Sequence, residues 1–289
     1  MTKRTTSARS LIVIVIGLVV ILVEGSQALS NDRRASNLSR LEQLGLPWKK
    51  GHLTLYSSHN AKDEATIYGA ELTAALDWYR EQLDWSGQVR MAVLDKVDYG
   101  RVTGIPYPSP HAEYRTGLII MADHIDEHPG FTEWDLEPIG LNTAFGFHEI
   151  GHVIAHDLGI WSPNAWVNEL VANIFMAGYV RAKRPQLDGF QRGLPVRFAT
   201  AGHTRGIADF DKLYFAMGQL DYLWFQFQIA RVADFLVSDQ AFPGVVEILR
   251  HEFPIEEARG RESVGSTLSR LERIRPGVTV IAASLPWEF

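Results

Sequence analysis

Five consecutive residues, His148-Glu149-Ile150-Gly151-His152, have the types and the spacing that metal-assisted hydrolysis needs. Residues four apart share one face of an α-helix, so His148 and His152 can direct their imidazole nitrogens at one metal ion. Glu149 follows one step around the helix, where its carboxylate can take a proton from an attacking water. The pattern H-E-x-x-H therefore predicts a zinc ion and a zinc-dependent hydrolase.

A catalytic zinc site needs a third protein ligand, and a downstream helix offers Glu169. Gly159 is typical of a helix C-terminus, and Ser162-Pro163 is typical of the start of the next helix. With a rise of about 1.5 Å per residue, His152 lies about 9 Å before the end of the first helix and Glu169 about 9 Å into the second. If the two helices are antiparallel, these two side chains lie at the same level.

The same count places His148 and Asn173 at one level, each about 15 Å from the turn. Asn173 is then expected to hold the imidazole ring of His148 through its second nitrogen. Other third ligands fit less well. A third histidine six residues after the motif is excluded by Leu158, His156 lies a turn further along the motif face, and Asp157 points elsewhere.

At these residues the chain resembles the gluzincin metallopeptidases, the thermolysin-like group in which H-E-x-x-H is followed by a helix with a glutamate ligand. The resemblance implies that His148, His152 and Glu169 bind zinc. It makes Glu149 the general base and gives Asn173 the place of an acidic residue that contacts a ligand. It also implies an α+β, zincin-like fold, with a small mixed N-terminal sheet, an active-site helix and a mostly helical C-terminal lobe.

The resemblance further implies a substrate-binding strand ahead of the motif helix. In gluzincins an edge strand pairs with the substrate backbone, and residues 117–121 are the matching segment. Gly117, Ile119 and Met121 are therefore expected to line the substrate. The segment lacks the acidic residue with which related aminopeptidases hold a free N-terminus. An ordinary core strand explains the same residues equally well.

A hydrogen-bond donor to the oxyanion of the transition state is also expected. Residues 213–218 are similar to the gluzincin stretch that delivers a tyrosine, which indicates Tyr214 for this role. Tyr222 and His203 are the alternatives. Packing of either tyrosine in the core is the simpler interpretation of the aromatic residues alone.

The N-terminal residues are typical of an export signal. Lys3, Arg4 and Arg9 precede an apolar run over residues 11–23, and small residues follow up to Ala28. The run is shorter than the roughly 20 residues of a membrane-spanning helix, so residues 1–28 are predicted to be a signal peptide, with an uncleaved anchor as the alternative. The protein is therefore expected to be periplasmic or extracellular.

Composition limits the other possibilities. The chain of 289 residues contains no cysteine, so thiolate zinc ligands and a cysteine nucleophile are excluded. Removing residues 1–28, which carry three basic residues and one acidic residue, changes the net charge from -6 to -8. Nucleic acid and anionic membrane surfaces are therefore poor partner candidates, apart from the possible N-terminal anchor.

Residues 29–289 are predicted to form one catalytic domain. An α/β lobe over residues 29–160 carries the motif helix, and a helical lobe over residues 161–289 carries the glutamate ligand. Hydrophobic periodicity and turn residues predict the following elements. Strands are predicted at 52–57, 89–94 and 117–121, helices at 61–83, 141–158, 163–182, 207–238, 244–253 and 266–274, an exposed lead-in at 29–50 and an irregular loop at 98–114.

These features together predict an exported zinc metallopeptidase that hydrolyses peptide bonds, with a peptide or a protein as its substrate. Two other hypotheses fit the same residues. One is a zincin-fold binding protein that has lost catalysis, and the other is a zinc amidase that acts on a non-protein substrate.

Overall fold

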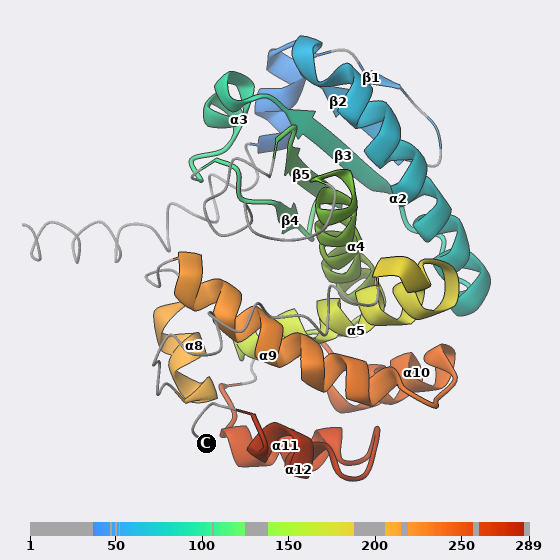
Figure 1. Ribbon diagram of the computed structural model, residues 1–289, viewed down its shortest axis with the longest axis vertical. Coiled ribbons are helices and arrows are strands. Elements are labelled where there is room, and N and C mark those ends of the chain that lie inside the picture. The colour runs from blue at the N-terminus through green and yellow to red at the C-terminus, as the bar shows by residue number, and fades with distance from the viewer. Residues whose placement is uncertain are drawn as a thin grey trace, which may run out of the picture.

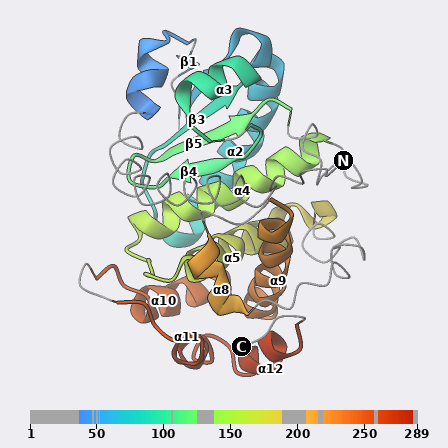
Figure 2. The same ribbon diagram turned by 90° about the vertical axis from the view of Figure 1, so that its left-hand side faces the viewer.

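The chain folds into a small mixed β-sheet covered by helices, followed by a region made of helices alone (Figure 1). The helix that contains the H-E-x-x-H motif lies between these two parts (Figure 2). This arrangement confirms the predicted α+β class, with an N-terminal sheet and a mostly helical C-terminal part. The computed structural model describes residues 37–46, 48–49, 51, 53–105, 107–124, 138–187, 206–214, 219–256 and 260–285.

Within this described part of the chain, the sheet has five strands in the order β1-β2-β3-β5-β4. Their bounds are β1 Trp48–Lys49, β2 Leu53–Ser57, β3 Val89–Leu94, β4 His111–Glu113 and β5 Leu118–Ala122. The strands β2, β3 and β5 run parallel, whereas β1 and β4 run antiparallel to their neighbours. The two central strands, β3 and β5, are mostly apolar because helices cover both faces of the sheet.

Each face of the sheet packs against its own set of helices. The helices near the sheet are α2 (Lys62–Leu83), α3 (Lys96–Val102) and α4 (Pro138–Asp157). On one face, α2 and α4 pack over Met91 and Ile119. On the other, Ala92 and Ile120 pack with α3 and with a helical segment at residues 37–43. The motif helix thus rests directly on the sheet.

The motif helix α4 and the next helix, α5 (Ala165–Lys183), form an antiparallel hairpin. Gly159 follows α4 with φ +79°, a left-handed conformation that glycine adopts without strain. The two helices approach very closely, since a Cβ atom added to Gly151 would lie 2.7 Å from the carbonyl oxygen of Ala172. Gly151 therefore permits direct backbone contact between α4 and α5.

The remaining helices pack around α5. They are α8 (Ile207–Leu213), α9 (Gln219–Val237), α10 (Phe242–Glu252), α11 (Val264–Leu271) and α12 (Val278–Ala283). Short 3-10 turns lie at His59–Ala61 and Pro185–Leu187. Helix α9 runs alongside α5 over much of its length, and α12 packs against α9 on the far side from the sheet (Figure 1). This places α9 where its side chains can reach those of α5.

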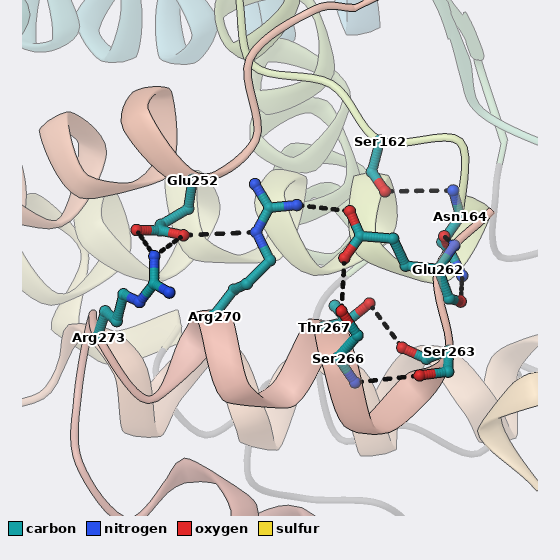
Figure 3. A network of polar contacts seen from close by, with 9 residues as sticks. All are labelled: Ser162, Asn164, Glu252, Glu262, Ser263, Ser266, Thr267, Arg270 and Arg273. Carbon is teal, nitrogen blue, oxygen red and sulfur yellow. Dashed lines mark hydrogen bonds and ion pairs between the residues drawn. The ribbon is translucent and has the colours of Figure 1, made fainter. Parts of the chain in front are cut away.

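Ion pairs and hydrogen bonds attach α11 to the α4–α5 hairpin (Figure 3). The buried carboxylate of Glu252, at the end of α10, accepts hydrogen bonds from Arg270 and Arg273. Arg270 also bonds Glu262, whose main-chain N–H and C=O are both held by the side chain of Asn164. Since Asn164 is the N-cap residue of α5, this network connects α11 to the start of that helix.

Most predicted elements are present, three predictions need correction, and one helix is additional. The predicted loop at 98–114 instead contains most of α3 and all of β4, because Asp95 caps α3 and the side chain of Tyr99 is buried. The predicted lead-in contains helical residues 37–43, of which Leu41 is fully buried. The single helix predicted at 207–238 is instead two helices. Helix α8 ends at Leu213, and α9 begins at Gln219. Helix α12 was not predicted.

The predicted signal peptide lies outside the described residues. Among the helices that are described, none is long and apolar enough to cross a membrane.

The Gly151 contact predicts the effect of one methyl group. Gly151→Ala should lower the free energy of unfolding by about 1–3 kcal/mol, because the new Cβ meets backbone atoms that cannot rotate away. Gly100→Ala in α3 is the matched control, since a Cβ there meets nothing within 4 Å. Helix propensity alone should make that control more stable by up to about 1 kcal/mol. Urea denaturation measures both, and equal stabilisation of the two variants would contradict the close approach.

The network around Glu252 predicts a dependence on pH. Burial raises the pKa of Glu252, but hydrogen bonds from Arg273, His251 and Arg270 outweigh burial and hold the pKa below its ordinary value. A lowered folded-state pKa stabilises the fold above the unfolded-state pKa, and this contribution is lost as the pH falls through the folded-state pKa. Glu252→Gln should therefore cost about 1–2 kcal/mol at neutral pH and less in acid.

Denaturant unfolding at several pH values measures this difference between the wild type and Glu252→Gln. Glu247→Gln is the control, because the Glu247 side chain is 75% exposed in its pair with Arg250. It should change stability little at any pH. A cost for Glu252→Gln that does not shrink in acid would show that the carboxylate charge is not the stabilising feature.

Candidate metal centre

Three side chains from α4 and α5 converge on one point. The Nε2 atoms of His148 and His152 lie 3.1 Å apart, and Oε2 of Glu169 lies 3.1 Å from the first and 3.5 Å from the second. These three residues form a group that could hold a metal ion, with His148 and Glu169 buried. The helical hairpin thus brings together the three residues that the sequence predicts as ligands.

The separations fit a tetrahedral ion. Zinc bound about 2.0–2.2 Å from each ligand atom keeps the ligand atoms about 3.3–3.6 Å from one another. The observed separations, 3.1, 3.1 and 3.5 Å, lie close to this range without any rearrangement. Two imidazoles and one carboxylate are a usual donor set of catalytic zinc, and three protein ligands leave a fourth position for water or substrate.

Glu169 is the charged centre of the group. Its side chain is 3% exposed, and a buried carboxylate is costly unless it is paired. Burial raises the pKa of Glu169, but the charge of His152 and hydrogen bonds with both histidines outweigh burial and hold the pKa well below its ordinary value. The carboxylate is therefore ionised and available to a cation.

Glu149, the predicted general base, is buried beside the three ligands. Burial is the main cause that raises its pKa to about 7, and the nearby charge of Glu169 adds to the effect. The charge of His148 and a hydrogen bond from the main-chain N–H of Ala112 act in the opposite direction. A carboxyl with a pKa near neutrality can both accept and return a proton, which suits general acid–base chemistry.

The segment predicted as an edge strand for the substrate is an inner strand of the sheet. Residues 118–122 form β5, which pairs with β3 on one side and with β4 on the other, so its main chain is not free to bind a substrate. Ile119 and Met121 are core side chains on the face covered by α4. Gly117, with φ +64°, belongs to the turn that joins β4 to β5. The outer strand beside α4 is β4.

Ala112, in the middle of β4, is the site residue that sequence reasoning missed. It lies opposite Ile119 in the β4–β5 pair, and a hydrogen bond from its main chain lowers the pKa of the Glu149 carboxyl. The glycines and prolines around residues 98–114 hid this strand of three residues. The alternation of side chains around Ala112 is too short to predict a strand without its partner, β5.

Two tyrosines reach Glu169 from the opposite side. The hydroxyl of Tyr214 donates to Oε1 of Glu169 at 2.5 Å, and that of Tyr222 lies 3.4 Å from Oε2. Burial, and then the negative charge of Glu169, raise the pKa of both tyrosines well above the ordinary value. Both hydroxyls therefore keep their protons. The third candidate donor, His203, lies outside the described residues.

The position of Tyr214 depends on the start of α5. Asp211, near the end of α8, accepts hydrogen bonds from the main-chain N–H of Trp166 and from the side chain of Asn164. Tyr214 is the C-cap residue of the same short helix and contacts Glu169, one turn further along α5. Helix α8 is thus attached to α5 at two points, which fixes the direction of the tyrosine.

Asn173 does not take its predicted place beside the His148 ring. Its side-chain amide donates instead to the main-chain oxygen of Glu169 at 2.9 Å and to Oε1 of Gln226 at 3.1 Å. Gln226 in turn donates to the carboxylate of Glu169 at 2.5 Å. The side chain of Asn173 is thus directed toward α9 by its contact with Gln226.

Comparisons with known proteins do not identify a family. A scan against models of protein families finds no match, and a search of the curated proteins finds none either. The gluzincin resemblance therefore stays a prediction, and the geometry of the site is the basis for a proposal about function.

The ligand assignment predicts different effects for two residues near each other. Glu169→Ala should weaken zinc binding by at least about 100-fold, because it removes the only charged donor of the three. His156→Ala should leave the affinity unchanged. His156 lies one turn beyond His152, but its ring packs at a tilt against Tyr114 with the centroids 4.7 Å apart, and it does not belong to the group of possible ligands among the described residues. Competition with a chelating indicator measures both affinities, and equal losses would show that the third ligand is misassigned.

Proposed function

We propose that this chain is a zinc-dependent metallopeptidase of the gluzincin type, with a zincin-like catalytic domain over residues 29–289. His148, His152 and Glu169 would bind one zinc ion, and Glu149 would be the general base. Export directed by residues 1–28 belongs to the same proposal. The chemistry is hydrolysis of a peptide bond in a peptide or protein.

One observation carries the proposal: the three predicted ligands converge with separations that fit tetrahedral zinc, and the carboxylate of Glu149 is buried beside them. Three groups with lone pairs directed at one point repel one another unless a proton or a cation lies among them. A structural role alone does not explain why Glu149 is also buried there, since it adds a second carboxylate to a site that already holds Glu169.

Each residue would have a defined task. Bound zinc supplies a Lewis acid that makes water nucleophilic near neutral pH. Glu149 takes the proton of the attacking water and returns it to the leaving amine. A main-chain hydrogen bond from Ala112, which lowers the pKa of Glu149, would help to hold this carboxylate in place. Tyr214, which keeps its proton, would turn its O–H group from Oε1 of Glu169 to the oxyanion, and Tyr222 is the alternative donor.

The substrate backbone would add to the outer edge of β4, which pairs with no other strand of the described residues. In an antiparallel ladder the N–H and C=O groups of one residue point to the same side, so an Ala112 N–H directed at Glu149 would place the Ala112 carbonyl on the outer side of β4 as well. A substrate N–H could donate to that carbonyl, and the scissile bond would then lie near Glu149. This geometry favours an extended peptide as the substrate.

The test compares the wild type with Glu149→Gln on a mixture of peptides of varied sequence. The wild type should bind one zinc ion per chain and cleave peptides, whereas Glu149→Gln should keep the zinc and lose at least about 100-fold in kcat, because the amide cannot accept the proton. Mass spectrometry of the products measures cleavage.

The other results separate the alternatives. If the wild type binds zinc but cleaves neither peptides nor non-protein amides, the result favours a binding protein without catalysis. If it cleaves non-protein amides but not peptides, the result favours a zinc amidase. Unchanged cleavage by Glu149→Gln would exclude the assigned general base.

A further inference from the structure

Gln226 contacts the metal-facing oxygen of Glu169 from α9. Its Nε2 atom lies 2.5 Å from Oε2 of Glu169, the same oxygen that lies 3.1 Å from His148. We propose that Gln226 is a positioning residue that holds the Glu169 carboxylate in the orientation needed to bind the metal. The inference rests on the metal-binding part of the function proposed above and assigns Gln226 no contact with the metal or the substrate.

The orientation of the Gln226 amide follows from its partners. The main-chain oxygen of Glu169 can only accept, so the atom of Asn173 beside it is the donor Nδ2. That Nδ2 also contacts Gln226, which makes the contacted atom the acceptor Oε1 and leaves Nε2 directed at Glu169. The side-chain carboxylate of Glu169 is an acceptor as well. The main-chain oxygen and the carboxylate of Glu169, at the two ends of this series of hydrogen bonds, therefore require the same orientation of the Gln226 amide.

A neutral donor suits this position. A lysine or an arginine beside Glu169 would compensate its negative charge and compete with the metal for it. The amide of Gln226 orients the oxygen without adding charge, and Tyr214 does the same for the other oxygen. The carboxylate is therefore held at both oxygens while its charge remains available to the cation.

The contact belongs to one face of α9. Tyr222 and Gln226 are four residues apart and share that face, and their side chains are 2.6 Å apart. Gln228 is fully buried on the same helix, and neither its Nε2 nor its Oε1 has a hydrogen-bond partner in the described structure. Two glutamines on one helix thus differ in whether they reach Glu169.

This difference supplies a matched pair of variants. Gln226→Met and Gln228→Met replace an amide by an apolar group of similar length. Gln226→Met should lower the affinity for zinc by about 10- to 100-fold, the usual effect of removing a group that orients a ligand. Gln228→Met should leave the affinity unchanged. The affinities are measured by competition with a chelating indicator, on protein whose folding is verified by its thermal unfolding midpoint without metal.

A spectroscopic readout separates positioning from general stability. Cobalt(II) can replace zinc, and its visible absorption depends on the arrangement of the ligands. The spectrum of Gln226→Met should shift relative to the wild type, and that of Gln228→Met should not. Because Asn173 and Gln226 act in one chain, the loss of affinity in Asn173→Ala with Gln226→Met should be smaller than the product of the separate losses.

The outcomes are distinguishable. If the wild type binds zinc and Gln226→Met binds it equally tightly with the same cobalt spectrum, the positioning role is wrong and the proposed metal site stands. If both glutamine variants lose affinity equally, the effect belongs to helix packing and the positioning role is again wrong. If the wild type itself binds no zinc, the proposed function fails and this inference fails with it.

Discussion

The burial of the Glu169 carboxylate is the constraint on which the rest of the structure depends. A charge with a side chain only 3% exposed needs partners, and the first three come from two helices: His148 and His152 of α4, and Gln226 of α9. Tyr214 adds a fourth contact from the end of α8. Because one carboxylate collects all these donors, the helical region cannot move away from the motif helix without leaving a buried charge unpaired.

The close contact of α4 and α5 makes this arrangement possible. Gly151, the fourth residue of the motif, lets the backbones touch beside Ala172, and this brings the two histidines within reach of Glu169. Gly151 therefore serves packing, while its neighbours His148 and His152 contact Glu169. On the other side, α4 rests on the sheet beside β4, where Ala112 meets Glu149. The site thus forms where one helix contacts both parts of the molecule.

Several of these features could be predicted from the sequence. The spacing of the two histidines and the position of Glu169 follow from helix geometry alone, as does the turn at Gly159, which has the expected left-handed conformation. Other features depend on groups far away in the sequence. Helix α5 begins after Asn164, where Asp211 of α8 supplies the capping carboxylate, so the N-cap predicted at Ser162 was wrong by two residues. No local pattern contains that information.

The sequence by itself determined the helical hairpin and the grouping of His148, His152 and Glu169, because residues four apart on a helix and the residues on either side of a short turn meet through local geometry. Only the tertiary structure decided which strand has a free edge, where Asn173 points and what holds Glu169. Strand order depends on pairing between distant segments, which put β4 rather than β5 at the edge. The amide of Asn173 turned to Gln226 because α9 packs along α5, a contact between residues 53 positions apart.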